Sequence, residues 1–239
     1  MHPNMDEPRV AIVSGAGRGL GQAICRRLLA AGTTVVGFDL QARNVECPIL
    51  AVDIRDQQAV QAAVGEVASV HGRIDVVVNN AGVNHRGRLD QTPDEAWQDV
   101  LDVNLHGTRR LSIAAHPHLA RSGGCIVNMA STAGTVAIAG TGAYGVSKAA
   151  IIHLTRVAAL EWAGDGIRVN AVAPTIVPTP MTQDVLDDTE YMAAKMSSIP
   201  LGRVVQPDEV VDSVEFLASD RARMVTGQVL HVDGGVTLR

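Results

Sequence analysis

The feature that most constrains the fold of this chain is a series of short, almost wholly apolar runs rich in β-branched residues. Strands that are apolar on both faces are required by a parallel sheet that helices cover on both sides. The runs span residues 10–13, 34–38, 49–52, 74–78, 125–129, 167–172 and 229–232. Segments of helical length lie between most of them, at 20–31, 57–71, 95–119, 143–163 and 208–218. The alternation predicts an α/β fold with a doubly wound parallel sheet of about seven strands flanked by helices.

Length and composition favour a single domain. The chain has 239 residues, 46% of them hydrophobic, which is sufficient for one sizeable core. No linker, repeat or low-complexity tract divides it. We expect residues 1 to about 8, which are polar and contain proline, to form a loose N-terminal tail, and residues 9–239 to form the domain.

Residues 175–205 form the one irregular insertion in this pattern. Three prolines break the segment, and it also carries methionines, among them Met181. Ligands of an open α/β sheet bind beyond the carboxyl ends of the strands, and this segment follows the sixth strand. We therefore expect a substrate lid at about 175–205, with an ordinary surface excursion as the alternative.

Charge and cysteine content limit the kinds of partner. The net charge is -5 and the sequence has no run of basic residues, which argues against nucleic acid and against an anionic membrane surface. No segment approaches the roughly 18 consecutive apolar residues of a membrane span. The three cysteines are scattered, as is typical of a reducing compartment. We expect a cytoplasmic protein with a small-molecule partner.

Two nearby histidines, His116 and His118, are the only sequence hint of a metal site. Metal ligation needs a third and a fourth ligand, and nothing in the sequence nominates them. A solvated helix end broken by Pro117 accounts for the same residues. We therefore predict that the protein holds no metal.

A glycine-rich turn, SGAGRGLG, joins the first predicted strand to the first predicted helix. Glycine lets the backbone turn sharply and approach a pyrophosphate, and the N-terminus of the following helix supplies free N–H groups and a partial positive charge. A purely structural turn is the alternative, but the flanking strand and helix favour dinucleotide binding. The expected contacts are Gly15, Arg18, Gly19, Leu20 and Gly21.

An acidic residue at the end of the second strand bears on the choice of dinucleotide. Asp39 lies 18 residues after Gly21, where a carboxylate can accept hydrogen bonds from both adenosine ribose hydroxyls. A 2′-phosphate would meet a like charge there. Arg18 argues the other way, because it could pair with that phosphate. Leu40 offers no second cation, so the sequence favours NAD over NADP.

The ends of the third and fourth strands supply further cofactor contacts. Asp53 could accept from the adenine amino group, although a helix cap is an equally good account of Asp53 or Asp56. In NNAG at 79–82, the small residues Ala81 and Gly82 would let a cofactor lie against the backbone. A strand-ending asparagine turn is the alternative. The expected contacts here are Asp53, Ile54, Asn80, Ala81 and Gly82.

Tyr144 and Lys148 form the core of the predicted catalytic site. Their spacing of four places both side chains on one face of a helix. A free phenol has a pKa of about 10. A neighbouring ammonium, together with a positive nicotinamide ring, favours the phenolate, so Tyr144 could exchange a proton with a substrate hydroxyl.

Two polar residues complete the predicted site. Ser131 follows the fifth strand, at the edge where the site should lie, and its hydroxyl can hydrogen-bond the substrate oxygen. Asn104 lies within a predicted helix, where asparagine is most often a surface or kink residue. Its functional interpretation is that it holds a water linking Lys148 to solvent.

Together these motifs resemble the one-domain short-chain dehydrogenase/reductase family over nearly the whole chain. The resemblance rests on GAGRGLG, NNAG, Asn104, Ser131, YGVSK and the closing TGQVLHVDGG, in that order. It implies a Rossmann-type sheet of seven strands and a homo-oligomer, tetramer or dimer. It also implies a catalytic tetrad of Asn104, Ser131, Tyr144 and Lys148, with Tyr144 and Lys148 also binding cofactor. Further cofactor contacts implied by the resemblance are Pro174, Val177 and Thr179.

The chain departs from the family pattern after the sixth strand. The family usually has Pro-Gly there, whereas this chain has Thr175 in the glycine position. Pro-Thr is similar to carbonyl and xylulose reductases and some polyol dehydrogenases, which favours sugars and polyols. His85 and Arg86 could give the pocket a polar, cationic rim, or could belong to a solvated loop. The substrate contacts we expect are Asn84, Ser131, Ala133, Thr141 and Met181.

The sequence therefore predicts an NAD-dependent oxidoreductase that interconverts a secondary alcohol and a ketone. One alternative is a 3-oxoacyl-thioester reductase, against which Asp39 and the net charge of -5 argue. A reductase of cyclic or hydrophobic ketones is another. A non-catalytic NAD-sensing protein on the same fold is the most distant alternative, because all four predicted catalytic residues are present.

Overall fold

The protein, described here from a computed structural model, forms a seven-stranded parallel sheet within residues 8–41 and 45–238. The strands are β1 (Val10–Ser14), β2 (Thr34–Asp39), β3 (Ile49–Ala51), β4 (Val76–Asn79), β5 (Cys125–Met129), β6 (Arg168–Pro174) and β7 (Val229–Val232). Their spatial order is β3-β2-β1-β4-β5-β6-β7, and every neighbouring pair is parallel. The predicted fold class is confirmed.

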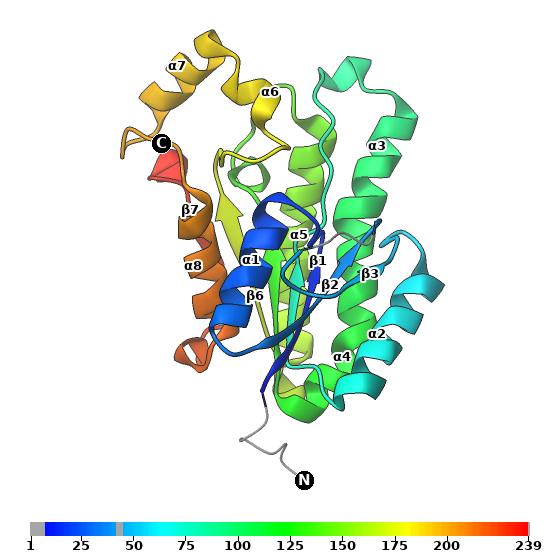
Figure 1. The fold of residues 1–239 in the computed structure, drawn as a ribbon. Helices are drawn as coiled ribbons and strands as arrows, with labels where there is room; N and C mark the ends of the chain where they lie inside the picture. Colours follow the sequence, from blue (N-terminus) through cyan, green and yellow to red (C-terminus); the bar gives the residue numbers. More distant parts are fainter. Residues whose placement is uncertain (1–7, 42–44, 239) are drawn as a thin grey trace.

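Helices cover both faces of the sheet (Figure 1). They are α1 (Gly19–Ala30), α2 (Gln57–His71), α3 (Asp94–Leu101), α4 (Thr108–Ser122), α5 (Gly142–Glu161), α6 (Gln183–Leu186), α7 (Thr189–Ser198) and α8 (Pro207–Ala218). Helices α1 and α8 pack together on one face, and α2, α4 and α5 pack on the other. Short α6 and longer α7 lie beyond the edge at which the strands end.

Consecutive side chains of the central strands enter two different cores. In β1, Ala11 and Val13 belong to the core under α1 and α8, whereas Ile12 belongs to the core under α2, α4 and α5. All three are fully buried. The same alternation holds in β4 and β5. A strand with a core on each face has no solvent-facing side, which explains why these runs contain almost no polar residues.

The segment predicted as one helix over 95–119 is divided in the structure, which corrects that expectation. Helix α3 ends at Leu101, a π-helical turn spans Asp102–Gly107 (η2), and α4 follows. Two close contacts accompany the turn. A Cβ on Gly107 would lie 2.9 Å from the side chain of Ile54, and the buried Asn104 bonds to a neighbouring loop. An i to i+5 turn keeps the chain helical while reorienting these residues.

Pro117 does not end its helix, contrary to the prediction. Helix α4 continues through it to Ser122 and ends at Gly123, which has a φ of +62°. His116 lies 2.9 Å from Asp165 and its ring centre lies 4.9 Å from that of Trp162. Within the described residues, no group of three or more His, Cys, Asp or Glu side chains is arranged to hold a metal ion.

The structure describes the whole of the predicted lid and almost none of the predicted tail. The expected tail falls, except for residue 8, outside the described residues. The predicted lid, residues 175–205, contains α6 and α7 and is therefore more regular than its composition suggested. None of the helices in the described part of the chain is long and apolar enough to cross a membrane.

Candidate active site

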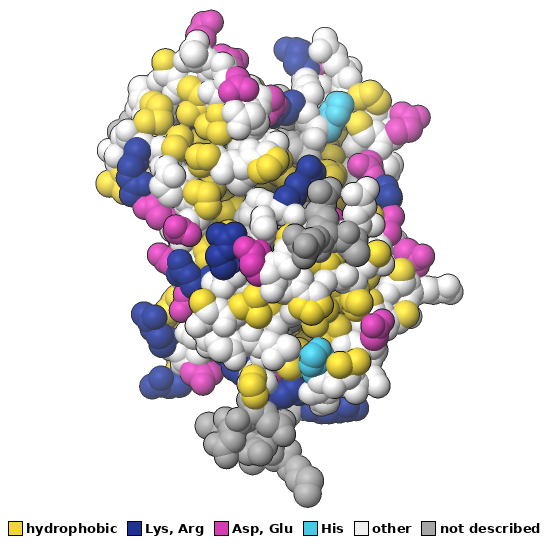
Figure 2. Space-filling model, viewed as in Figure 1, with side chains coloured by type: hydrophobic (Ala, Val, Ile, Leu, Met, Phe, Trp, Pro, Cys, Tyr) yellow, Lys and Arg dark blue, Asp and Glu magenta, His cyan; other side chains and the backbone are white. Residues whose placement is uncertain are grey.

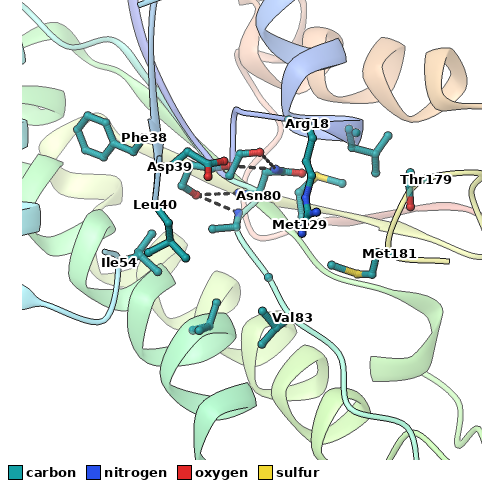
Figure 3. Close-up of a pocket in the computed structure, with 18 of the residues that line it drawn as sticks. Arg18, Phe38, Asp39, Leu40, Ile54, Asn80, Val83, Met129, Thr179 and Met181 are labelled. Atoms are coloured by element: carbon teal, nitrogen blue, oxygen red, sulfur yellow. Dashed lines mark hydrogen bonds between the residues drawn. The ribbon is translucent and has the colours of Figure 1, made fainter. Parts of the chain in front are cut away.

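A cavity of about 340 Å³ opens at the carboxyl ends of β1 and β4. The order of the sheet reverses between these two strands, and this topological switch point is where open α/β sheets bind ligands. Residues from both halves of the chain line the cavity, as Figure 3 shows for ten labelled side chains. Of the predicted cofactor contacts, Val177 is absent from this lining and is instead buried in the core.

Two glycines of the glycine-rich turn, Gly15 and Gly21, are packed so closely that side chains could not replace them. Gly15 has a φ of +66°, a region that favours glycine. A Cβ on Gly21 would lie 2.0 Å from the carbonyl oxygen of Gly15. The Asn80 amide donates to the carbonyls of Ser14 and Gly15, at 3.0 and 3.1 Å, and so ties β4 to the turn. The turn is therefore a cradle shaped to admit a pyrophosphate next to bare backbone, at the N-terminus of α1.

Asp39 is held in place by the same turn. Its Oδ2 accepts a hydrogen bond of 2.9 Å from the backbone N–H of Gly17. Its Oδ1 has no hydrogen bond within the described residues, so one carboxylate oxygen is available to a ribose hydroxyl. Leu40 beside it is 64% exposed and supplies no cation. Arg18 extends into the pocket toward the side of Thr179 and Met181, away from Leu40 (Figure 3).

Asp53 and Asp56 have separate roles that the sequence left open. Asp56 is the helix cap, because its Oδ1 accepts from the backbone N–H groups of Gln58 and Ala59 at the start of α2. Asp53 lines the cavity, and both of its oxygens accept hydrogen bonds from Arg55. The Arg55 guanidinium holds the pKa of the Asp53 carboxyl below its usual range. The predicted contact with adenine would have to share this carboxylate with Arg55.

Tyr144 lies next to two of its predicted partners, because it shares a hydrogen bond with Ser131 and lies near Lys148 on the same helix. Tyr144 and Lys148 line the cavity from α5, and the Lys148 ammonium nitrogen lies 5.5 Å from the centre of the Tyr144 ring. Lys148 is 4% exposed and donates a 2.6 Å hydrogen bond to the carbonyl of Met129 at the end of β5. Burial lowers the pKa of Lys148 to about 8. A buried ammonium with one carbonyl partner is poised near neutrality.

The electrostatics of Tyr144 differ from the expectation. Burial raises the pKa of the Tyr144 phenol above its ordinary value, while a hydrogen bond with Ser131 and the charge of Arg86 act in the opposite direction. The predicted lowering of the Tyr144 pKa by the Lys148 ammonium is therefore not the dominant effect. The reason is physical: removing the phenolate from water outweighs these stabilising contacts.

Asn104 is buried in the π-helical turn. Its Oδ1 accepts from the backbone N–H of Val83 at 2.8 Å, and its Nδ2 donates to the Val83 carbonyl and to Ser147 Oγ, each at 3.0 Å. Both amide protons are thus used by protein groups, and the predicted water between Asn104 and Lys148 stays a prediction. The Ser147 hydroxyl in turn donates to the carbonyl of Tyr144 at 2.7 Å. Asn104 therefore connects the loop after β4 to the helical turn that carries the phenol.

Sequence reasoning missed two sets of supporting polar residues. Ser147 is fully buried, and its position one residue before Lys148 on a helix was a usable signal. Below the site, Asn79 donates to Asn128 and Ser112, and Asn128 donates to Thr155. Each of these residues sits in an apolar strand or on a helix face turned to the core. These hydrogen bonds link β4 and β5 to α4 and α5. The Asn79 Oδ1 is buried without a partner among the described residues.

A second cavity, of about 470 Å³, adjoins the first. Both are lined by Arg18, Gly82, Val83, Pro180 and Met181. The second cavity is also lined by Asn84, His85, Arg86 and Asp184. Figure 2 shows the corresponding face of the molecule, hollowed between the upper end of α3 and the lobe formed by α6 and α7, with charges of both signs around it.

The remaining predicted substrate contacts are less well placed. Thr141 is buried, and its hydroxyl donates to the carbonyl of Ile138 at 2.8 Å. Ala133 donates its backbone N–H to Ser131 Oγ, at 3.2 Å. Neither residue lines the two cavities, unlike Asn84 and Met181. The hydroxyl of Thr175, at the departure from the family pattern, is buried without a hydrogen-bond partner among the described residues.

This fold and this constellation define a class of dinucleotide-dependent oxidoreductases. A family model described as Enoyl-(Acyl carrier protein) reductase matches residues 15–237. The chain belongs to the short-chain dehydrogenase/reductase family, oxidoreductases that act on CH–OH groups.

Among curated relatives, the chain is 37% identical to meso-2,3-butanediol dehydrogenase of Serratia marcescens, covering 96% of this chain and 94% of that one. It is 35% identical to 3-oxoacyl-(acyl-carrier-protein) reductase FabG of Thermotoga maritima, covering 97% and 99%.

Solved structures of dehydrogenases and reductases are also similar to this chain over nearly its whole length. A gluconate 5-dehydrogenase from Burkholderia cenocepacia, in complex with NADP and tartrate, is 32% identical with a TM-score of 0.92, covering 97% of this chain and 96% of that one. A 3-ketoacyl-(acyl-carrier-protein) reductase from Brucella melitensis, complexed with NADH, is 30% identical with a TM-score of 0.88, covering 97% and 99%. Binding of NAD or NADP is thus a property of close structural neighbours.

Proposed function

We propose that this protein is an NAD-dependent oxidoreductase that interconverts a secondary alcohol and a ketone, with a sugar or a polyol as substrate. The observation that carries the proposal is the lining of a single cavity. It joins the glycine cradle and the carboxylate of Asp39 to the phenol of Tyr144 and the ammonium of Lys148. Dinucleotide recognition and acid–base chemistry therefore share one continuous space.

In the oxidative direction, Tyr144 as phenolate accepts the proton of the substrate hydroxyl. Ser131 donates a hydrogen bond to the substrate oxygen and orients it. Lys148, whose ammonium faces the Tyr144 ring, stabilises the phenolate electrostatically. Asn104 holds this arrangement through Val83 and Ser147. The dinucleotide supplies, when bound, the nicotinamide carbon that takes up hydride.

The preference for NAD over NADP rests on Asp39. One oxygen of this carboxylate is fixed by Gly17, and the other is free to accept from a ribose hydroxyl. A 2′-phosphate at the same place would meet the negative charge at short range. Arg18 is directed toward the other side of the pocket, so it does not compensate that repulsion in this arrangement.

A sugar or polyol is favoured over an acyl thioester by the polar groups of the second cavity, where Asn84 and Arg86 lie. The relatives that act on butanediol and gluconate support this choice. The similarity to 3-oxoacyl-(acyl-carrier-protein) reductases keeps a 3-oxoacyl thioester as the second candidate.

The test is a substrate panel with purified protein. Sugars, polyols, cyclic alcohols and hydroxy acids are each incubated with NAD, and NADH absorbance is recorded; a 3-oxoacyl thioester with NADPH forms the second arm. We expect turnover in the first arm and loss of nearly all of it in Tyr144→Phe, with fold and NAD binding retained. Turnover of the variant within about tenfold of wild type, only ~1.4 kcal/mol of barrier, would refute the assigned role of Tyr144.

We also propose a homo-oligomer, tetramer or dimer, in a reducing cytoplasmic compartment. Apolar side chains remain exposed on α4, α5 and β7, namely Ile113, Val146, Val157, Leu160 and Leu230. Leu160 is 82% exposed, and exposed apolar side chains of this size favour burial against a second copy. The three cysteines are free thiols, which supports the reducing compartment. Light scattering of wild type and Leu160→Asp tests the assembly, and a monomeric wild type would contradict it.

A further inference from the structure

Arg86 occupies an unusual position at the wall of the second cavity. It lies in the loop after β4, and its Nε is 3.2 Å from Asp184 Oδ2 on α6. The guanidinium makes no hydrogen bond within the described residues, so the edge formed by its two terminal nitrogens has no partner. Its positive charge reaches the catalytic phenol, since it acts to lower the pKa of Tyr144. Arg86 is therefore a partly exposed cation in the second cavity, which adjoins the cavity that Tyr144 lines.

Asn84, two residues before Arg86, places an unpaired hydrogen-bond acceptor in the same cavity. It lines the same cavity, and its Oδ1 is buried with no hydrogen-bond partner among the described residues. Buried amide oxygens are nearly always satisfied, because leaving one unpaired costs about 1–3 kcal/mol. An unpaired acceptor in the wall of a ligand cavity points to a hydroxyl donor on the ligand.

The charges around the second cavity favour an anion. Arg18 and Arg86 face it from opposite elements, the glycine-rich turn and the loop after β4, whereas Asp184 is the acidic residue of its lining. Asp184 is 61% exposed and holds only the Nε side of Arg86. The terminal nitrogens of a guanidinium form a fork that matches a carboxylate with two parallel hydrogen bonds.

We propose that Asn84 and Arg86 form a subsite for the polar end of a hydroxy acid, an aldonate-like substrate with a carboxylate and neighbouring hydroxyls. The carboxylate pairs with the free edge of Arg86, and a hydroxyl near the reacting carbon donates to Asn84 Oδ1. Asp184 is a positioning residue that orients the guanidinium from α6. This inference rests on the proposed function and names the substrate class of the same site.

The first test compares substrates that differ only in charge. Aldonates of four to six carbons are each paired with the alditol of the same length and configuration, and kcat/KM with NAD is measured. We expect Arg86→Gln to lower kcat/KM for aldonates at least tenfold while changing that for alditols less than threefold. Arg88→Gln is the matched control, because Arg88 lies in the same loop and pairs with exposed Asp90 outside both cavities. Equal losses on both substrates in Arg86→Gln would overturn the proposal.

The second test measures binding without turnover. In a Tyr144→Phe background saturated with NAD, calorimetry gives the Kd of an aldonate. We expect that adding Arg86→Gln weakens this Kd at least tenfold, whereas adding Arg88→Gln leaves it unchanged. An unchanged Kd in both double variants assigns Arg86 to fastening α6 alone and refutes the subsite.

Asn84→Leu separates a binding role from a structural one. Removing an unsatisfied buried acceptor should leave the free energy of unfolding unchanged or raise it, because no protein partner is lost. We expect kcat/KM for aldonates to fall about tenfold, with no fall for a deoxy analogue that lacks the neighbouring hydroxyl. A destabilised protein with equal losses on both substrates would contradict the role. Absence of turnover with every alcohol in wild type would refute the proposed function itself.

Discussion

At the residue scale, the protonated side chain of Lys148 is disfavoured by its burial. It is almost fully buried, its hydrogen-bond partner is one carbonyl, and burial lowers its pKa to about 8. A buried cation of this kind destabilises the fold at neutral pH, because the unfolded chain solvates the ammonium better. In the proposed mechanism, this positive charge stabilises the phenolate of Tyr144.

The lowered pKa of Lys148 predicts that the free energy of unfolding depends on pH. Between pH 8 and the ordinary lysine pKa of about 10.5, the unfolded chain holds a proton that the folded chain has released, so wild-type stability rises with pH through this window. Lys148→Met lacks this dependence. At neutral pH we expect Lys148→Met to be more stable than wild type. We expect this difference in the free energy of unfolding to shrink by about 2 kcal/mol between pH 7 and pH 9.5, as measured by chemical denaturation. Parallel pH profiles would show that Lys148 is not buried as a cation.

The carboxylates of Asp39 and Asp53 allow a matched test of cofactor choice. Asp39→Asn keeps an oxygen that can accept from Gly17, yet removes the charge that repels a 2′-phosphate. We expect the ratio of kcat/KM for NAD to that for NADP to fall by about 10- to 100-fold, the scale of one charged hydrogen bond. Asp53→Asn is the control, because the predicted adenine contact is common to both dinucleotides. An unchanged ratio in Asp39→Asn would overturn the assignment.

At the element scale, the first βα turn depends on two glycines packed against each other. In Gly21→Ala the new methyl group would lie 2.0 Å from the Gly15 carbonyl, so the turn must open. We expect a loss of about 1–3 kcal/mol in stability despite the better helix propensity of alanine. Dinucleotide affinity should fall at least tenfold, as measured by calorimetry.

Gly65 in α2 provides the control for that substitution. A Cβ there meets nothing within 4 Å, so Gly65→Ala should stabilise the protein by about 0.5–1 kcal/mol and leave dinucleotide affinity unchanged. If the two substitutions had similar effects, the close packing of the turn would not control binding.

Elements were predictable where local signals suffice. The span 57–71 was predicted for α2 and is observed, because Asp56 caps its start and Gly72, with a φ of +73°, ends it. The π-helical turn at Asp102–Gly107 could not be predicted. Its bonds depend on Asn104 reaching Val83, a contact between two segments, and hydrophobic periodicity does not distinguish a shift of one residue in hydrogen bonding.

At the scale of the whole molecule, the sequence predicted the edge of the sheet at which the cavity lies, but not all of the contacts there. Strand ends were sufficient to place Asp39, Asn80 and Ser131 at one edge, because parallel strands end together. The ion pair of Arg86 with Asp184 joins the loop after β4 to the segment after β6, and no local pattern encodes it. Likewise, the pKa of Tyr144 depends on how deeply the assembled fold buries it.

Binding at the switch point should stabilise the whole fold, because the cavity is built from β1, β2, β4 and α5 together. A ligand at 100 times its Kd adds about 2.7 kcal/mol to the free energy of unfolding. For a chain of this size we expect NADH at that concentration to raise Tm by roughly 5–10 °C. NADPH at the same concentration should raise it by less than about 2 °C, if the charge of Asp39 weakens its binding about 100-fold.

Three variants show where this difference should come from, and thermal unfolding followed by circular dichroism measures it. Tyr144→Phe should keep most of the shift with NADH, because the substitution removes at most one of the many predicted contacts with the dinucleotide. Gly21→Ala should lose most of it, because the cradle for the pyrophosphate opens. Asp39→Asn should narrow the gap between NADH and NADPH by raising the NADPH shift. Equal shifts for the two dinucleotides in wild type would mean that the adenosine end does not discriminate, and the preference for NAD would then be wrong.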